Sequence, residues 1–144
     1  MTYVKKLAEE TVERIREAWL DHQVIFFRDQ DLTHQQHIAF ASQFGELHVH
    51  PTVPHPSDYP EGIIIHADKN SLQVAGGGWH SDVTFEENPP VGSVLRLTET
   101  PSDGGGATLF SSMYSAYEAL SPAFQEFLDG RDALHQLGNL PGHR

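Results

Sequence analysis

A histidine and an aspartate stand two positions apart near the middle of the chain, as His80 and Asp82. The three residues that follow, Val83, Thr84 and Phe85, favour the extended conformation and predict a strand. Alternate residues of a strand project from the same face. The imidazole and the carboxylate would then lie side by side, as two neighbouring ligands of one metal ion must.

The residues around this pair indicate which kind of metal site it would be. Gly76, Gly77 and Gly78 allow the backbone to bend sharply just before the strand. A His-X-Asp pair supplies two of the three ligands in the two-histidine, one-carboxylate triad of non-haem Fe(II) oxygenases. The same tripeptide also arises by chance in acidic chains, so a surface pair without a metal is the alternative explanation.

Composition limits the other ligands and partners. The 144 residues contain no cysteine, so ten histidines and the carboxylates are the only pool of transition-metal ligands. Nine basic and twenty acidic residues give a net charge of −11, which argues against nucleic acid or an anionic membrane as a partner. We find neither an apolar signal core nor an apolar run of about 20 residues that would span a membrane. A single domain of a soluble acidic protein is therefore expected, and its predicted location is the cytoplasm.

The first element that could position the pair is an amphipathic helix near the N-terminus. Its apolar residues recur at intervals of three and four positions, the spacing of one helix face. They are Ala8, Val12, Ile15 and Trp19. The next apolar run, residues 24–27, predicts a short buried strand.

Capping signals predict a second helix. Thr33 is suited to the N-cap, and Gln36 three residues later completes a capping box. Gly45 is predicted to end the helix just beyond its last turn. His48 and His50 follow, where a strand gives way to a proline-rich loop. Such places often bind ligands, although a plain surface connection explains the composition as well.

The remaining chain predicts short strands, two turns and two further helices. The predicted strands cover residues 63–65, 80–85, 91–98 and 108–110, and the turns cover residues 68–70 and 101–106. Residues 91–110 would form an antiparallel hairpin with a long loop. A helical apolar stripe runs from Met113 to Leu120, and Ser121 with Pro122 begins a last helix that Gly130 ends.

Four ordered blocks of this sequence resemble one family. They are residues 22–30 (HQVIFFRDQ), 44–51 (FGELHVHP), 79–85 (WHSDVTF) and 101–110 (PSDGGGATLF). The resemblance extends from about Arg14 to His135 and includes the run from Met113 through Leu120. On these blocks the chain resembles the taurine dioxygenase and 2,4-dichlorophenoxyacetate dioxygenase (TauD/TfdA) family of Fe(II)- and 2-oxoglutarate-dependent dioxygenases.

The resemblance implies a fold and a reaction. The implied fold is mixed α/β, with a double-stranded β-helix (jelly-roll) core and flanking helices, incomplete in this chain. The implied reaction uses Fe(II) and O2 to oxidise 2-oxoglutarate to succinate and CO2 while a small anionic organic substrate is hydroxylated. In taurine-type members the hydroxylated carbon then breaks down and releases sulfite and an aldehyde. A homo-oligomer is compatible with the family, and the sequence does not decide it.

The resemblance also assigns roles to individual residues. His80 and Asp82 match the first two iron ligands of the family. Thr108 matches the residue whose hydroxyl binds a carboxylate of 2-oxoglutarate. His50 matches the histidine that contacts the sulfonate of the substrate, and Val83 is predicted as a further substrate contact.

The chain departs from the family pattern in its metal ligands. The family places its third iron ligand, a second histidine, and then an arginine that holds 2-oxoglutarate well after the His-X-Asp pair. Here the sequence stops at Arg144, His135 falls in a segment without a ligand role in the family, and His143 is almost terminal. The 144 residues are interpreted as one TauD/TfdA-like domain, truncated before those two residues and inactive alone.

A second departure concerns the substrate. Taurine-specific members hold the amine with a tyrosine and other polar side chains, whose places fall here on Val53, Ala75 and Gly76. The predicted substrate is therefore a sulfonate or a sulfate ester without an amine, cleaved oxidatively at its C–S or C–O bond.

Two alternative functions remain open on the sequence. A non-catalytic fragment of the fold would bind a metal weakly through His80 and Asp82, because two protein ligands do not complete the triad. A Zn(II) or Mn(II) hydrolase would instead place His48, His50, His80 and Asp82 on one metal, since zinc accepts histidine and aspartate ligands. Coding sequence after Arg144 that supplies a histidine and an arginine would favour the oxygenase over the fragment.

Overall fold

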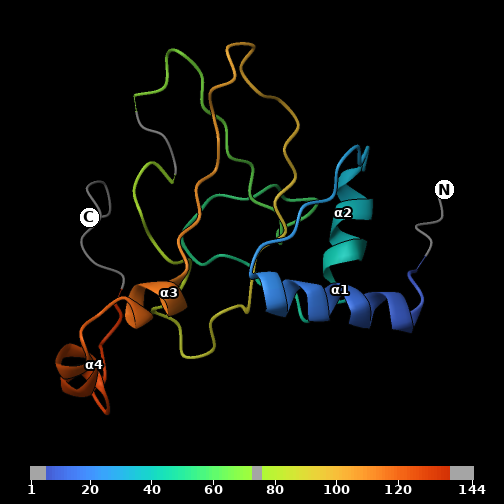
Figure 1. The fold of residues 1–144 in the computed structure, drawn as a ribbon. Helices are drawn as coiled ribbons and strands as arrows, with labels where there is room; N and C mark the ends of the chain where they lie inside the picture. The colour runs from blue at the N-terminus through green and yellow to red at the C-terminus, as the bar shows by residue number, and fades with distance from the viewer. Residues whose placement is uncertain (1–5, 73–75, 137–144) are drawn as a thin grey trace. The chain divides into compact units, whose positions relative to one another are not determined.

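A computed structural model describes residues 6–72 and 76–136, in which four helices form and the rest of the chain is irregular (Figure 1). The helices are α1 (Glu9–His22), α2 (His34–Ala41), α3 (Met113–Glu118) and α4 (Pro122–Leu128). The chain divides into two compact units, Met1–Val94 and Leu95–Arg144. Among the described helices, none is both long enough and apolar enough to cross a membrane.

The first predicted helix is confirmed as α1. It begins after Ala8, whose backbone is extended, and Glu9 and Glu10 occupy its first turn. Carboxylates at this end interact favourably with the helix dipole. The helix ends where Gln23 adopts a left-handed φ of 64° and its amide donates to the Trp19 carbonyl at 2.7 Å.

The start of α2 confirms the predicted capping box. The Thr33 hydroxyl accepts a hydrogen bond from the Gln36 amide at 3.2 Å, and the Gln36 side-chain oxygen accepts from the Thr33 amide at 2.8 Å. Two amides that the helix itself leaves without a partner are thereby satisfied. The cap is local, so the sequence alone was sufficient to place it.

The predicted end of α2 at Gly45 is wrong. The last helical residue is Ala41 and Ser42 is the C-cap with a right-handed backbone, so the position just beyond the cap is Gln43 and not Gly45. The Ser42 hydroxyl and the Gln43 side-chain amide both donate to the Ala39 carbonyl at 3.1 Å. Side chains thus satisfy the end of the helix, and no left-handed glycine is needed there.

Hydrogen bonds connect the α1 region to the end of α2, and an aromatic cluster lies beside α2. The Arg16 guanidinium on α1 donates to the Phe44 carbonyl, just beyond α2, at 3.2 Å. The Phe40 ring lies between Phe27 and Phe44, with ring centroids 5.7 and 5.1 Å apart. No side chain in the described part of the chain is fully buried, so this cluster is only partly shielded from water.

The segment 91–94 packs against both helices of the first unit. The Trp19 indole on α1 occupies the space where a β-carbon of Gly92 would lie, so only glycine fits there. On α2, His37 Nε2 is 2.8 Å from the carbonyl oxygen of Val94 and donates to it. These two contacts fix the segment that follows the candidate metal ligands.

The segments predicted as strands form no sheet in the part of the chain that the structure describes. Residues 24–27, 63–65, 91–98 and 108–110 run as irregular chain. A strand needs a neighbour to accept and donate its backbone hydrogen bonds, and short isolated strands are unstable in water. The jelly-roll core therefore stays a prediction.

The second unit contains the predicted glycine turn. The Gly104 amide donates to the Pro101 carbonyl at 3.3 Å, and the Gly105 amide donates to the Asp103 carboxylate at 2.9 Å. Gly104 and Gly106 have left-handed φ values of 80° and 75°, which favour glycine. The turn predicted from composition is confirmed.

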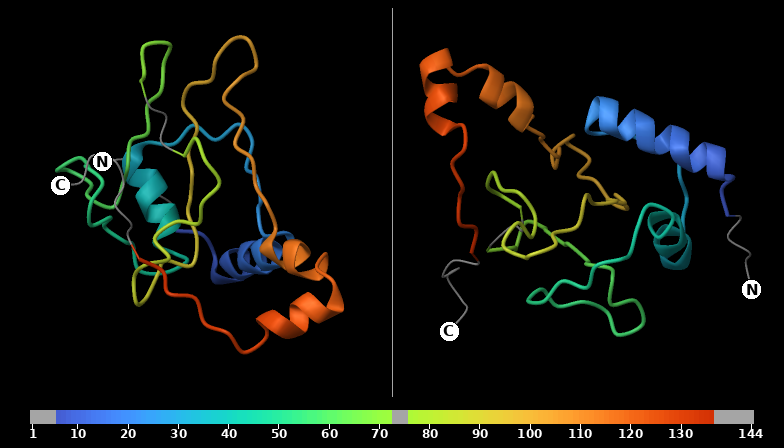
Figure 2. Two further views of the ribbon diagram at one scale, coloured as in Figure 1. Left: turned by 90° about the vertical axis from the view of Figure 1, so that its left-hand side faces the viewer. Right: turned by 90° about the horizontal axis from the view of Figure 1, so that it is seen from below.

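The last two helices follow the turn and meet at a sharp bend (Figure 2). Ser121 caps α4 by accepting from the Phe124 amide at 3.3 Å, Pro122 occupies its first turn, and Gly130 beyond its end has a φ of 70°. The Gln125 side chain donates to the Tyr117 carbonyl of α3 at 2.9 Å. The predicted start and end of α4 are confirmed.

Candidate active site

His80 and Asp82 lie at the start of a tight turn, not on a strand. Residues 82–85 form the turn, and the Glu86 amide closes it by donating to the Val83 carbonyl at 3.1 Å. Val83 has a φ of 53°, which is incompatible with a strand, so the strand predicted here is wrong. A β-branched residue in this left-handed region is an outlier that costs about 1–3 kcal/mol. The rest of the structure must hold the turn in place.

The two side chains nevertheless meet. His80 Nε2 lies 3.1 Å from Asp82 Oδ1. His80 Nδ1 lies 2.7 Å from the carbonyl oxygen of Gly78, which can only accept, so Nδ1 carries the ring proton. In the neutral ring, Nε2 then directs a lone pair toward a carboxylate oxygen. Two lone pairs at this distance require a proton or a cation between them.

The pair fits two neighbouring ligands of one metal ion. Donor atoms about 2.1 Å from a metal and at right angles to each other lie about 3.0 Å apart. Ser93 donates to the second oxygen of Asp82 at 3.4 Å, while Gly78 holds the second nitrogen of His80. Metal-binding histidines and carboxylates commonly have their outer atoms held in this way. The side chains of His80 and Asp82 are 55% and 61% exposed, so an ion can reach them.

The pair supplies part of a metal site. Over residues 6–72 and 76–136, no group of three or more histidine or carboxylate side chains converges to hold a metal. In this part of the chain His48 and His50 do not group with His80 and Asp82, and the hydrolase alternative gains no support from the structure. His135 lies exposed in the irregular segment after α4, and the terminal His143 lies outside the described residues.

His50 is held by the backbone that follows it. Its Nδ1 accepts hydrogen bonds from the amides of Thr52 and Val53, at 3.2 and 3.1 Å. The ring proton of neutral His50 is therefore on Nε2, where it can be donated to an anion. Val53, predicted only as an apolar replacement for a tyrosine, thus also contributes a backbone amide that sets this tautomer.

His48, two residues before His50, is paired with a carboxylate. Its Nε2 lies 2.9 Å from Glu86 Oε2, and the two side chains are only 26% and 28% exposed. The rings of His48 and His50 are nearly perpendicular, with centroids 6.1 Å apart. Glu86 was not among the predicted site residues. No local spacing signal identifies Glu86, because its partner His48 lies 38 residues earlier in the sequence.

Gly76 lies next to the metal-ligand pair. Its φ is 77°, so the predicted bend before the pair is confirmed at this glycine. A β-carbon there would lie 3.6 Å from Cε1 of His80, an ordinary contact distance. A side chain at this position would border the ligand ring, as the interpretation of Gly76 as a substrate-pocket position requires. Ala75 lies outside the described residues. Trp79, just before His80, is 72% exposed.

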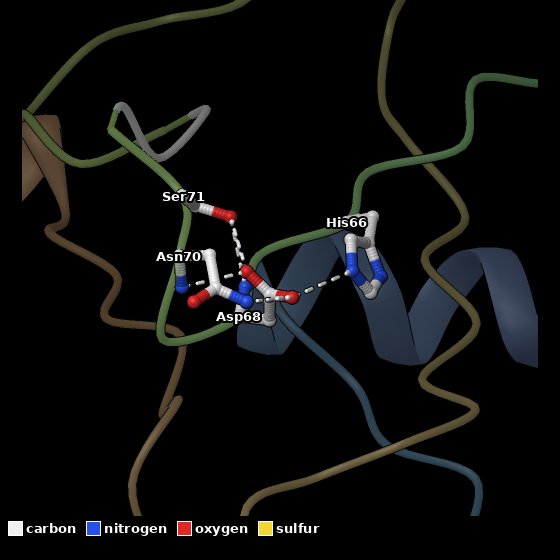
Figure 3. Close-up of polar contacts among 4 residues, drawn as sticks. All are labelled: His66, Asp68, Asn70 and Ser71. Carbon is white, nitrogen blue, oxygen red and sulfur yellow. Dashed lines mark hydrogen bonds and ion pairs between the residues drawn. The ribbon is translucent and has the colours of Figure 1, made fainter.

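The predicted turn at residues 68–70 is confirmed and is closed by side chains (Figure 3). Asp68 Oδ1 accepts from the Asn70 amide at 2.9 Å and from the Ser71 hydroxyl at 3.1 Å. These hydrogen bonds lower the pKa of Asp68 below its usual value of 3.8, and the bond from the Asn70 amide has the largest effect. His66 Nε2 is 3.9 Å from the other carboxylate oxygen. The turn accounts for all of these polar groups.

The remaining predicted site residue belongs to the second unit. Thr108 lies exposed in the irregular segment between the glycine turn and α3. Its predicted contact with 2-oxoglutarate therefore stays a prediction.

Comparison with known proteins identifies relatives of the chain. Residues 1–142 match the family model described as "Taurine catabolism dioxygenase TauD, TfdA family". The chain is 33% identical over 123 residues to an alpha-ketoglutarate-dependent sulfonate dioxygenase of Saccharomyces cerevisiae, covering 78% of this chain and 30% of that protein. It is 36% identical over 132 residues to an alpha-ketoglutarate-dependent sulfate ester dioxygenase of Pseudomonas putida, covering 87% of this chain and 40% of that protein.

A fungal relative shows similar coverage. The alpha-ketoglutarate-dependent dioxygenase cnsP of Penicillium expansum is 38% identical over 122 residues, covering 77% of this chain and 33% of that protein. The chain thus spans about a third of the length of the curated relatives it matches.

Proposed function

The chain belongs to the TauD/TfdA family of taurine catabolism dioxygenases, and from this premise we propose that the protein is a 2-oxoglutarate-dependent dioxygenase. We propose Fe(II) as its metal and a small sulfonate or sulfate ester as its substrate. The observation that carries the proposal is the 3.1 Å approach of His80 Nε2 to Asp82 Oδ1, with the outer atoms of both side chains held by hydrogen bonds.

The metal ligands are oriented by their neighbours. The Gly78 carbonyl fixes the tautomer of His80, and the Ser93 hydroxyl steadies Asp82. Because both side chains are already oriented, little ordering is required when an ion binds. Fe(II), when bound, supplies the oxidising chemistry that couples O2 and 2-oxoglutarate to hydroxylation of a C–H bond.

The organic ligands are proposed to bind through three side chains. His50 donates its Nε2 proton to an oxygen of the sulfonate or sulfate group, which suits the tautomer set by the Thr52 and Val53 amides. Thr108 donates its hydroxyl hydrogen to a carboxylate of 2-oxoglutarate. Val83, directly after the ligand Asp82, contacts the alkyl part of the substrate. In a chain with a net charge of −11, such local donors are what attracts an anion.

The proposed reaction balances for both substrate types. One oxygen atom of O2 enters the C–H bond next to sulfur or to the ester oxygen, and the other enters succinate as 2-oxoglutarate loses CO2. A hydroxylated alkanesulfonate then breaks its C–S bond to give an aldehyde and sulfite. A hydroxylated alkyl sulfate breaks its C–O bond to give an aldehyde and sulfate.

The substrate class is supported by two lines of observation. Two relatives are named for sulfonates and sulfate esters. The positions at which an amine would need a polar side chain fall on Val53, Gly76 and Ala75. An ammonium group without a partner in a closed pocket is strongly disfavoured. A substrate with an anionic end and an apolar end is therefore proposed, in preference to taurine.

The test is a substrate panel assayed with the protein at the full length encoded by its gene. Consumption of 2-oxoglutarate and release of sulfite or sulfate are followed for a short alkanesulfonate, an alkyl sulfate, taurine and an aryloxyacetate. We expect the alkanesulfonate or the alkyl sulfate to be turned over much faster than taurine. Taurine as the best substrate would contradict the interpretation of Val53 and Gly76, and turnover of the carboxylate alone would also contradict the role of His50.

A further inference from the structure

The contact between His48 and Glu86 links two parts of the candidate site. His48 precedes the proposed anion-binding residue His50 by two positions, and Glu86 follows the metal ligand Asp82 by four. The two side chains are 38 residues apart in sequence, yet Nε2 and Oε2 lie 2.9 Å apart. Their exposed fractions, 26% and 28%, are about half those of the metal-ligand pair. Shielding from water strengthens such a contact.

Glu86 also belongs to the strained turn that presents Asp82. Its amide donates to the carbonyl of Val83, the β-branched residue with a φ of 53°. A left-handed valine persists only where surrounding contacts hold it, and such outliers concentrate at functional sites. Glu86 therefore holds the turn twice, through its backbone to Val83 and through its carboxylate to His48.

We propose that His48 and Glu86 are positioning residues that hold the anion-binding segment 48–53 and the metal-ligand turn 82–86 in register. Neither touches the reacting atoms. His48 fixes the start of the segment whose amides set the tautomer of His50, while Glu86 fixes the end of the turn that orients Asp82. This inference rests on the proposed function for its substrate readout, and its metal readout is independent of turnover.

The variant Glu86→Ala tests the proposal in the protein at the full length encoded by its gene. The exposed neighbour Glu87→Ala is the matched control, because it removes the same charge one residue away. The KM for an alkyl sulfate and the dissociation constant of Mn2+, measured by titration calorimetry, are compared with thermal unfolding. We expect both constants to rise about tenfold in Glu86→Ala and to stay unchanged in Glu87→Ala.

Two further variants separate positioning from a merely structural role. Glu86→Gln keeps an acceptor oxygen for His48, so both constants should stay within about threefold of the original. His48→Ala removes the same contact by deleting the imidazole, and it replaces Glu86→Ala in the test if that variant does not fold. Combining His48→Ala with Glu86→Ala should add little to either single change, because both remove the same contact.

The outcomes are distinct. Unchanged KM and unchanged Mn2+ affinity in both alanine variants overturn the proposal, even if their melting temperatures fall. Absence of 2-oxoglutarate turnover in the unaltered protein contradicts the proposed function, and the Mn2+ titrations then decide the positioning role alone. If the unaltered protein binds no Mn2+, both are wrong.

Discussion

Among the histidine–carboxylate contacts of the first unit, the pair His80–Asp82 and the pair His48–Glu86 are built in different ways. His80 and Asp82 are two residues apart, more than half exposed, and each is oriented by a hydrogen bond on its far side. His48 and Glu86 come from distant parts of the chain, and each is only about a quarter exposed. An exposed local pair is suited to receive an ion. A shielded pair between distant segments is suited to hold parts of the structure together.

Removing a metal ligand should have the largest effect and should separate the two pairs most clearly. His80→Ala or Asp82→Ala should abolish 2-oxoglutarate turnover, because neither side chain has a substitute among the described residues. The comparable change at Glu86 should raise KM and the Mn2+ dissociation constant without abolishing turnover. Ser81→Ala, which lies between the ligands, is the control, and circular dichroism checks the fold. Turnover retained in both ligand variants would refute the metal assignment.

The cosubstrate contact predicted at Thr108 should give an intermediate effect and should leave both pairs intact. Thr108→Val keeps the β-branched shape and removes the hydroxyl. A lost hydrogen bond to a charged group costs about 1.5–3 kcal/mol, so the KM for 2-oxoglutarate should rise about ten- to a hundredfold. Mn2+ affinity should not change. The exposed Thr98→Val is the control, and an unchanged KM in Thr108→Val would show that Thr108 has no part in cosubstrate binding.

Relieving the backbone strain at Val83 should have a smaller effect, and it should stabilise the protein. Val83→Gly removes a left-handed strain of about 1–3 kcal/mol and adds about 0.5–1 kcal/mol of backbone entropy cost. We expect the free energy of unfolding, measured in urea, to rise by about 1 kcal/mol. If Val83 contacts substrate as proposed, KM should rise at the same time. The control Thr84→Gly adds the backbone entropy cost without relieving strain, so it should lower the free energy of unfolding. If Val83→Gly also lowers it, the turn stores no strain at Val83.

The smallest effect is expected at Asp68, a carboxylate whose contacts are all within three residues. The Asn70 amide and the Ser71 hydroxyl lower its pKa in the folded state. A carboxylate whose pKa is lower in the folded state stabilises the protein at pH values above its unfolded-state pKa. That stabilisation is lost as the pH falls through its folded-state pKa. The stability difference between the original protein and Asp68→Ala should therefore shrink as the pH falls through the lowered folded-state pKa. A difference that does not shrink as the pH is lowered below 3.8 would contradict this origin. The exposed Asp132→Ala provides the baseline.

Sequence reasoning succeeded where the determining contacts are local. The Thr33–Gln36 capping box and the Ser121 cap of α4 each lie within four residues, so residue types alone place them. The approach of His80 to Asp82 followed from their spacing, although a turn produces it and the predicted strand does not form. In each case the partner is fixed by the same short piece of backbone.

Sequence reasoning failed where a distant partner or a competing side chain decides. The cap of α2 lies at Ser42, where the side chains of Ser42 and Gln43 satisfy a helix carbonyl, and not just before Gly45. The contact of Glu86 with His48 spans 38 residues, and no spacing rule connects them. Strands likewise depend on neighbours that a single segment does not specify.

The placement of the two tryptophans has an optical consequence. Trp19 on α1 lies against Gly92, whereas Trp79 is exposed and directly precedes the proposed ligand His80 in sequence. A paramagnetic ion held by His80 and Asp82 would quench nearby indole emission, and each tryptophan has a route to the pair: Trp79 directly precedes His80, and Trp19 contacts the residue before Ser93, which donates to Asp82. The molecule thus carries its own fluorescent reporters of ion capture, and comparing Trp79→Phe with Trp19→Phe would show which indole reports it.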